Sequence, residues 1–402
     1  MAERRRDNRG RILRNGESQR KDGRYVFSYF NSKGKRRFLY SWRLDKNDRT
    51  PAGVKRDLSL REKEFKLQCA IMAGLNPDGA DMTVTDLVEK YISTKTGVRN
   101  NTRKGYKTTV NYLKQTDFGD RKITSITVSD AKLFLIGMQT KDGKSFSSIH
   151  SVRGVLNPAF RMAYEDDLIK KNPFNFELKD LIKDDSIARE AINQRQERLF
   201  LEFVKADPHY RRYYDGMYIL FKTGLRISEF CGLTEADLDM KRKIIHVTHQ
   251  LLRNENGGLY IEETKTGSGT RDIPMTENVY QCLVSILEKR RDEIIGPEVD
   301  GYRGFLFLDK NGRPTVAMHW EKYFHYALGK YNRTYKEELP LITPHVCRHT
   351  FITNMVRAGM SLKQLQYLAG HSEISITLDI YTHMQFEDVE KEVHRIEACS
   401  TE

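Results

Sequence analysis

The sequence predicts a multidomain α+β protein, and three patterns along its 402 residues support this fold class. Near the N-terminus, two neighbouring runs of alternating aromatic residues are typical of a small β-sheet. The middle of the chain shows four stretches with the apolar spacing of amphipathic helices. The C-terminal half mixes helical stripes with short strands and Gly-rich turns. We therefore expect three domains: residues 1–80, a small three-stranded sheet with a helix; residues 81–185, a helical domain; and residues 186–402, a mainly α domain with a small β-sheet.

Positive charge is concentrated at the N-terminus. The net charge is +13, and residues 1–50 contribute +10 of it, with 16 Lys or Arg against 6 Asp or Glu. This asymmetry favours a nucleic-acid partner, with a solubilising tail as the alternative. No apolar run reaches membrane-spanning length and no signal peptide is evident, so we expect an intracellular protein without membrane partners. The five scattered cysteines form no C-x-x-C pair, which argues against a disulfide framework or a zinc ribbon.

The N-terminal stretch is predicted to be a DNA-binding module. The first dozen residues suggest a flexible basic leader. Two alternating runs then predict a hairpin, Tyr25, Phe27 and Tyr29 on one strand and Phe38, Tyr40 and Trp42 on the other. One sheet face would be aromatic and the other partly Arg-bearing, and a basic ribbon of this kind fits the major groove. The candidate DNA-binding residues here are Arg24, Lys35, Arg36 and Arg37.

A helix is expected to follow the hairpin. Ser59 is a candidate N-cap, and Phe65, Cys69 and Met72 recur at helical spacing. This helix could cover one face of the sheet and leave the basic face free. The alternative is an ordinary α+β domain whose basic face is incidental.

Four helices are predicted between residues 81 and 185. The first begins after Thr83, with Asp86 at capping-box distance and a stripe at Val84, Leu87, Val88 and Tyr91. The others begin near Thr102, Ser129 and Ser145. The helix from Ser129 has Leu133 and Phe134 as apolar residues, and Pro158 predicts a kink or break in the helix from Ser145. Basic residues on this bundle, candidates for DNA contacts, are Lys104, Lys107 and Arg153.

Two motifs in the C-terminal half carry candidate cations. Thr223-Gly224 ends a helix, and Gly224-Leu-Arg226-Ile-Ser-Glu229 starts the next; Arg226 could instead form only a surface ion pair with Glu229. Strands at residues 243–248 and 259–263 are predicted to pair around a Gly-rich turn. Lys265 follows in Thr-Lys-Thr-Gly, where it could reach a substrate or remain a mobile surface side chain.

A third motif follows Pro344, which suits a helix start. His345 and Arg348 lie three residues apart and so share a helix face, a pairing that suits a phosphate better than a core. Downstream come Leu365-Gln-Tyr-Leu368-Ala-Gly-His371 and, ten residues after that His, Tyr381. The spacing of His345 and His349 also permits a helical zinc pair, but no Glu follows His345.

These motifs resemble the signature of the tyrosine recombinase, or phage integrase, family: Gly-x-Arg-x-x-Glu, His-x-x-Arg-His, Leu-x-x-Leu-x-Gly-His and a later Tyr. The resemblance covers about residues 80–390. With the N-terminal ribbon it is greatest for integrases of conjugative transposons. It implies the tyrosine recombinase fold, with an arm-type DNA-binding domain, a helical core-binding domain, and a catalytic domain with a C-terminal tail helix. It also implies a cytoplasmic bacterial protein associated with the nucleoid.

The resemblance implies cleavage and rejoining of DNA through a covalent 3′-phosphotyrosine, with no metal, ATP or other cofactor. Tyr381 would be the nucleophile, because it follows the His371 motif at the family's spacing, whereas Tyr367 precedes that motif and is expected in the core. The six catalytic positions implied are Arg226, Lys265, His345, Arg348, His371 and Tyr381. A chromosome-dimer resolvase or invertase of the same family, and a catalytically silent DNA-binding regulator, remain alternatives.

The expected partners also follow from the resemblance. They are double-stranded DNA with core-type and arm-type sites, further copies of the chain in a tetramer, and possible excisionase and DNA-bending proteins. After Tyr381, a narrow apolar stripe continues on a short charged helix at Phe386, Val389, Val393 and Ile396. Such a short helix needs a partner surface, and we expect a neighbouring protomer rather than its own domain.

Overall fold

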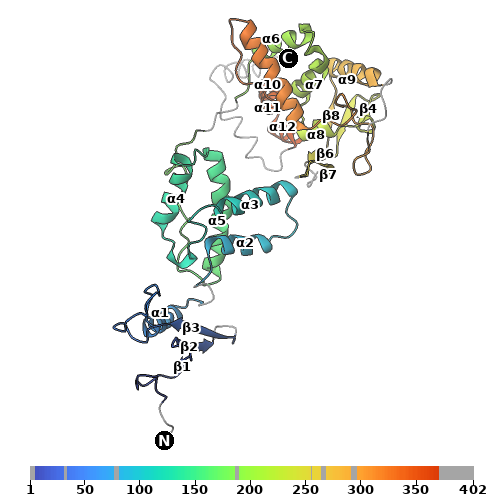
Figure 1. Cartoon of the computed structure of the whole chain (residues 1–402). Helices are drawn as coiled ribbons and strands as arrows, with labels where there is room; N and C mark the ends of the chain where they lie inside the picture. Colours follow the sequence, from blue (N-terminus) through green and yellow to red (C-terminus); the bar gives the residue numbers. More distant parts are fainter. Residues whose placement is uncertain are drawn as a thin grey trace, which may run out of the picture. The chain divides into compact units, whose positions relative to one another are not determined.

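The computed structural model describes residues 5–30, 34–76, 81–185, 190–254, 256–263, 269–290 and 297–370, and the chain separates into two compact units, residues 1–186 and 187–402 (Figure 1). The first unit contains a small sheet and a helical bundle with separate cores, and the second contains the motif-bearing helices. Three predicted site residues, Lys265, His371 and Tyr381, lie outside the described residues, as does the predicted tail helix. Within the described ranges, no helix is long and apolar enough to cross a membrane.

The N-terminal sheet is antiparallel, in the order β1 (Glu17–Gln19), β2 (Tyr25–Phe30), β3 (Arg36–Ser41). The register places Tyr25 opposite Ser41 and Phe27 opposite Leu39. Helix α1 (Leu60–Met72) begins at Ser59, whose hydroxyl caps it in a capping box with Glu62. The expected three-stranded sheet with a helix is therefore confirmed.

The predicted buried face of α1 is wrong. Phe65 and Met72 are 68% and 87% exposed, whereas Leu60 and Glu64 are buried. The reason is tertiary: Leu60 packs into the small core with Tyr25 and Leu44, and Arg61, beside it, bonds to Glu17 at 3.0 Å. These contacts fix the rotation of the helix, so the more apolar stripe faces outward.

The predicted flexible leader is also wrong for residues 5–12. Arg6 and Ile12 form an antiparallel bridge around a tight turn. Asp7 closes this turn, because its buried carboxylate accepts hydrogen bonds from the backbone N–H groups of Arg9 and Arg11 and from the Tyr25 hydroxyl. The basic side chains of this segment are thus held next to the sheet rather than on a loose arm.

The helical bundle comprises α2 (Val84–Ser93), α3 (Asn100–Leu113), α4 (Val128–Thr140) and α5 (Phe146–Glu165). The predicted α2 stripe is buried, and the Thr83 capping box is present. Two details differ from expectation. Leu133 is 66% exposed, and α4 instead buries Ala131, Leu135 and Met138. Helix α5 continues through Pro158 without a break, because proline costs one hydrogen bond that a long, well-packed helix can lose.

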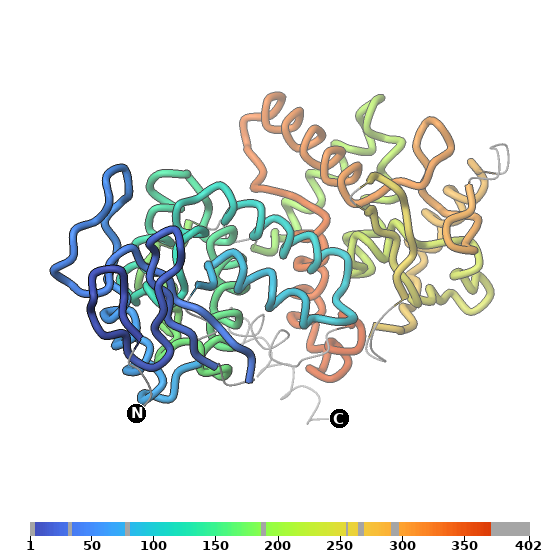
Figure 2. The backbone as a smooth tube through the Cα atoms, turned by 60° about the horizontal axis from the view of Figure 1, so that its bottom comes forward, coloured from blue at the N-terminus to red at the C-terminus, as the bar shows by residue number. Residues whose placement is uncertain are grey.

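In the second unit, the described residues form seven α-helices around a large core. They are α6 (Gln194–Ala206), α7 (Tyr214–Thr223), α8 (Ile227–Gly232), α9 (Glu277–Arg290), α10 (Ala317–Thr334), α11 (Pro344–Arg357) and α12 (Leu362–Ala369). Helix α11 packs against α7 and α12, and α12 contacts strand β8 (Arg271–Pro274). In Figure 2 the last two described helices are the red end of the chain. This packing brings the ends of α7, α11 and α12 together.

The strands of this unit form two small sheets. One has the order β4 (Leu238–Asp239), β5 (Ile244–Val247), β8 (Arg271–Pro274), and the other pairs β6 (His249–Arg253) with β7 (Leu259–Glu263). The predicted pairing of residues 243–248 with 259–263 is wrong, because the chain changes sheets at Thr248. The ring of His249 bonds to the Gly232 carbonyl at 2.8 Å and holds β6 against α8.

Candidate active site

Arg226 is placed by a turn that only glycine fits well. Helix α7 ends at Thr223, and Gly224 follows with φ 65°, in the left-handed region. A Cβ at this position would lie 2.5 Å from Cδ1 of Phe351, so the Phe351 ring also leaves no room for a side chain. The turn makes Arg226 the N-cap of α8, and its backbone N–H donates to Oε2 of Glu229 at 2.9 Å.

Helix α11 positions His345 and Arg348. Thr343 caps the helix by accepting from the Val346 N–H, and Pro344 occupies its first turn, as the sequence predicts. Arg348 is buried, at 6% exposure, and its Nη1 donates to the Gly224 carbonyl at 2.6 Å. Its Nη2 donates to the Ala369 carbonyl at the end of α12. His345 lies on the exposed side of the same helix, almost one turn earlier.

Arg226, His345 and Arg348 line one hollow of about 870 Å³. The three predicted site residues that fall within the described ranges are therefore brought together, although Arg226 lies more than a hundred residues from the other two in sequence. The opposite wall comes from α10, and sequence analysis did not single it out. Its side chains in the hollow are Met318, Glu321, Lys322, His325 and Tyr326. The sequence indicates these residues only by a run of polar and aromatic side chains that precedes the His345 motif.

The charges around this hollow are unbalanced. Glu229 is a buried carboxylate next to the hollow, and it pairs with Arg226 at 2.7 Å and with Arg271 at 2.8 Å. Burial opposes the charged form of Glu229, but hydrogen bonds and charge from Arg271, then the charge of Arg226, lower its pKa to about 2. Burial, followed by the nearby charges of Arg226 and Arg271, lowers the pKa of Arg348 to about 9. At pH 7 the cluster therefore holds three guanidinium cations and one carboxylate.

The other tyrosine considered, Tyr367, is not a core residue. It is 55% exposed, and its hydroxyl accepts a hydrogen bond from the Asp272 N–H at 3.1 Å. The prediction failed because an apolar ring on an amphipathic helix need not face the core when its hydroxyl finds a backbone partner. Among the described residues, no group of three or more His, Cys, Asp or Glu side chains could hold a metal ion.

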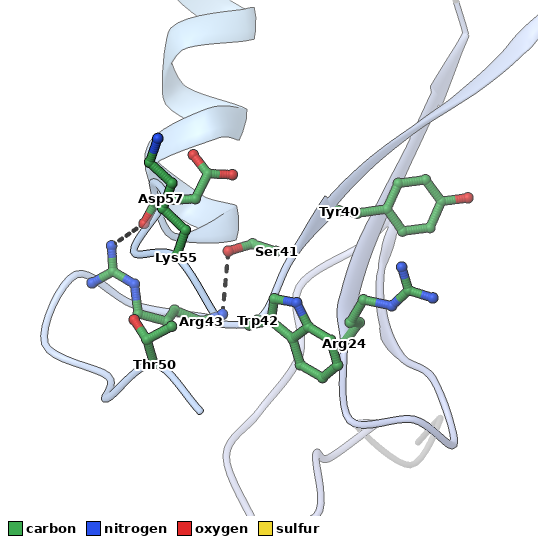
Figure 3. A pocket seen from close by; sticks show the side chains of 8 residues that line it. All are labelled: Arg24, Tyr40, Ser41, Trp42, Arg43, Thr50, Lys55 and Asp57. Atoms are coloured by element: carbon green, nitrogen blue, oxygen red, sulfur yellow. Dashed lines mark hydrogen bonds between the residues drawn. The ribbon is translucent and has the colours of Figure 1, made fainter. Parts of the chain in front are cut away.

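A second candidate surface lies on the face of the N-terminal sheet opposite α1. Val26, Ser28 and Phe30 of β2 share this face with Arg36, Phe38 and Tyr40 of β3, as the register requires. Arg24 lies 5.6 Å from the Trp42 ring and 6.0 Å from the Tyr40 ring (Figure 3). Arg36 lies 5.6 Å from the Phe38 ring. The open face thus combines aromatic and basic residues, whereas the sequence analysis assigned them to opposite faces.

A small hollow of about 180 Å³ lies beside these side chains. Figure 3 shows the residues that line it. Its floor is fixed by Arg43, whose backbone N–H donates to the Ser41 hydroxyl and whose guanidinium donates to the Asp57 carbonyl. Lys55 and Thr50 complete the rim. A polar hollow beside the partly exposed side chains of Trp42 and Arg24 is a surface that can contact a sugar–phosphate backbone.

The remaining candidate DNA-binding residues lie in several environments. Lys35 is exposed just before β3, and Arg37 is exposed opposite Tyr29 on the face that α1 partly covers. Lys104 and Lys107 are exposed on α3. Arg153 differs, because its guanidinium donates to the carbonyls of Phe174 and Phe176 inside the bundle.

Comparisons with known proteins agree with these two surfaces. Residues 190–388 match the family described as "Phage integrase family", and residues 1–71 match the family described as "DNA binding domain of tn916 integrase". The first match contains the hollow with Arg226 and Arg348, and the second contains the sheet with Arg24 and Trp42.

Whole-length relatives are also found. The chain is 44% identical to the transposase from transposon Tn916 of Enterococcus faecalis, over 98% of this chain and 97% of the relative. It is 26% identical to the tyrosine recombinase XerC of Bacillus pumilus, over 66% of this chain and 79% of that protein. A solved structure of the Tn1549 transposon integrase in complex with transposon right end DNA is 42% identical, with a TM-score of 0.74, and the match covers 79% of this chain and all of that one.

Proposed function

The chain belongs to the phage integrase family of tyrosine recombinases, and from this premise we propose that it integrates and excises a conjugative transposon. It is a tyrosine-type site-specific DNA recombinase. The observation that carries the proposal is the convergence of Arg226, His345 and Arg348 on one hollow with a surplus of positive charge. The likeness to the Tn916 transposase over nearly the whole chain supports a transposon as the substrate.

Two arginines in the hollow hold the scissile phosphate in this proposal. The guanidinium groups of Arg226 and Arg348 donate to its non-bridging oxygens and stabilise the negative charge that develops there. Burial strengthens this effect, because Arg348 interacts with the charge across protein rather than water. His345, on the exposed side of α11, is placed to donate a further hydrogen bond at the rim.

The residues outside the described ranges complete the reaction. The Tyr381 oxygen attacks phosphorus and forms a 3′-phosphotyrosine, while the bond from phosphorus to the 5′ oxygen breaks. Lys265 gives a proton to this leaving oxygen, and His371 assists. A new 5′ hydroxyl then reverses the same step on a second duplex. The energy of the phosphodiester bond is retained in the intermediate, so neither ATP nor a metal ion is required.

DNA is bound by separate parts of the chain. We assign residues 1–80 to arm-type sites, residues 81–185 to core-type sites and residues 186–402 to catalysis. On the open sheet face, the guanidinium groups of Arg24 and Arg36 lie at cation–π distance from aromatic rings, and Arg24 also pairs with Asp22 at 2.7 Å. A face that combines rings and cations in this way suits insertion into the major groove. Lys104 and Lys107 supply phosphate contacts from α3.

The active assembly is a tetramer on two duplexes. The apolar stripe after Tyr381 docks on a neighbouring protomer, and an excisionase and a DNA-bending protein set the direction of the reaction. Deleting the chain after Met384 is expected to reduce tetramers on DNA in light-scattering measurements. An unaltered assembly profile would instead indicate docking of the stripe on its own domain.

The proposed activity is tested with a duplex that carries an end of the transposon and a nick beside the cleavage site. The short cleaved strand diffuses away, so the covalent intermediate accumulates. Wild type and Tyr381→Phe are compared on a denaturing gel in the presence of EDTA. The expected result is a covalent protein–DNA band for wild type alone.

Each other outcome contradicts part of the proposal. A band with both proteins would move the nucleophile to another tyrosine. No band with either protein, although the DNA is bound, would indicate a silent DNA-binding regulator. A band that requires added divalent metal would exclude the metal-free mechanism.

A further inference from the structure

Arg271 is the most enclosed charged side chain next to the hollow, and the proposed reaction assigns it no role. It is the first residue of β8, and its side chain is fully buried. Nη2 and Nη1 donate to the two carboxylate oxygens of Glu229 at 2.8 and 3.2 Å. Nε donates to the Leu368 carbonyl at 2.9 Å, and Nη1 also donates to the Gly269 carbonyl. Arg271 does not line the hollow.

Glu229 connects Arg271 to Arg226. The Glu229 carboxylate accepts two hydrogen bonds from the guanidinium group of Arg271. It also accepts hydrogen bonds from Nη1 and the backbone N–H of Arg226. The side chain of Arg226 nevertheless remains 37% exposed to the hollow. If Arg271 were absent, the buried charge of Glu229 would have Arg226 as its nearest cation, and Arg226 would be drawn away from the hollow.

Three arginines also hold the end of α12. Its last carbonyls have no partners within the helix and carry partial negative charge. Arg271 binds the carbonyl of Leu368, Arg348 that of Ala369 and Arg226 that of Gly370, the last at 2.6 Å. Gly370 adopts the left-handed conformation that ends the helix, and His371 is the next residue in the sequence. One backbone segment therefore sets the spacing of all three guanidinium groups.

We propose that Arg271 is a positioning residue of this recombinase: it neutralises Glu229 and anchors the end of α12, so that Arg226 and Arg348 keep their charge directed at the scissile phosphate. With Arg271 in place, the cluster of three arginines and Glu229 has an excess of two positive charges. Without it, the excess falls to one, and more of the charge of Arg226 and Arg348 must compensate Glu229. The role is indirect, because Arg271 touches carboxylate and backbone rather than DNA.

The inference rests on the proposed function, and the test separates the two. The full-length chain is compared with Arg271→Met, Arg271→Lys, Glu229→Gln and the double variant Glu229→Gln/Arg271→Met. The measured quantities are the single-turnover rate of covalent complex formation on the nicked transposon-end duplex and the Kd for the same duplex. If wild type forms no covalent complex, the proposed function fails before Arg271 is tested.

Arg271→Met is expected to lower the cleavage rate on the order of 10- to 100-fold, as for a displaced reacting group, with Kd unchanged. The double variant is expected to cleave faster than Arg271→Met, because it lacks the negative charge of Glu229 that Arg271 would otherwise neutralise. This recovery is a non-additive coupling that a role in folding alone does not produce. Arg271→Lys is expected to lie between wild type and Arg271→Met, because lysine keeps the charge and loses the fork.

A neutral methylphosphonate at the scissile position gives the decisive control. It removes the charge that the clamp is proposed to hold, so the rate difference between wild type and Arg271→Met should disappear. A difference of the same size on both substrates would overturn the proposal, as would wild-type cleavage by folded Arg271→Met. If Arg271→Met does not fold, the double variant and Arg271→Lys are used instead. A ratio of variant to wild-type cleavage rate that is equal on the phosphate and methylphosphonate substrates would then overturn the proposal.

Discussion

Two buried charge clusters, one in each unit of the molecule, differ in which sign is in excess. Behind the N-terminal sheet, the carboxyl groups of Glu17 and Glu64 are buried together, and Arg61 bonds to Glu17 at 3.0 Å. In the second unit, Arg226, Arg271 and Arg348 surround the single carboxylate of Glu229.

The excess charge is resolved differently in the two places. Burial and then the charge of Glu17 raise the pKa of Glu64 to about 7, so this carboxyl takes up a proton near neutral pH. Arg348, with a pKa lowered to about 9, stays charged at that pH. Its charge leaves the hollow open to an added anion. A buried excess of acid therefore marks a pH-sensitive part of the structure, whereas a buried excess of arginine beside a hollow marks a phosphate site.

The largest effect is expected when the N-terminal region is removed. A chain that begins at residue 81 is expected to lose all binding to arm-type DNA in gel-shift measurements, because the sheet face with Arg24 and Arg36 is gone. Cleavage of the nicked core duplex should continue, since the arginine cluster is intact. If both activities fell together, the two regions would not be functionally separate.

The next effect concerns the arginine cluster itself. Arg348→Ala is expected to lower the rate of covalent complex formation on the order of a hundredfold or more, the usual cost of losing a charged donor to a developing oxyanion. Arg357→Ala, at the other end of α11 and outside the lining of the hollow, is the matched control. Full activity of the Arg348 variant would exclude that residue from the clamp.

The acid cluster predicts a pH dependence of stability. The folded-state pKa of Glu64 lies above its unfolded value, so its contribution is fully present below about pH 4.5 and is lost as the pH rises to about 7. Glu64→Gln should therefore stabilise the sheet domain at pH 8 by about 3 kcal/mol. Hydrogen exchange of strands β1–β3 in the full chain measures this, and equal protection of both proteins at pH 4 is the internal control. Unchanged protection at pH 8 would contradict the prediction.

The smallest expected effect tests the orientation of the same helix. Met72→Ser should change the stability of the sheet domain by less than about 0.5 kcal/mol, because this side chain is 87% exposed. Leu60→Ala, fully buried on the opposite face, should destabilise the domain by about 2–5 kcal/mol. Reversed sensitivities in chemical denaturation would restore the orientation that the apolar stripe predicted.

Local signals in the sequence predicted much of this structure. Ser59 and Thr83 start their helices by capping, Gly224 ends α7, and Pro344 starts α11. These signals act within a few residues, where sequence and geometry are directly linked. The motif resemblance then identified Arg226 and Arg348, which the structure brings to one hollow.

What sequence analysis missed depends on distant partners. Arg271 acquires its position from Glu229 and Leu368, which lie 42 and 97 residues away. The rotation of α1 depends on Arg61 reaching Glu17, 44 residues earlier. The sheet change at Thr248 depends on the Gly232 carbonyl that His249 finds. The periodicity of one segment does not contain this information, because the position or rotation of each element depends on contacts with another segment.

The turn at Gly224 has a consequence for the entropy of the reaction. Its carbonyl anchors Arg348, and the Phe351 ring packed against it prevents the turn from relaxing. The guanidinium therefore loses its rotational freedom when the chain folds, long before DNA arrives. Ordering a flexible side chain at the moment of binding costs about 0.5–1.5 kcal/mol, and this hollow avoids that cost for Arg348. The activation entropy of cleavage should accordingly contain little contribution from Arg348.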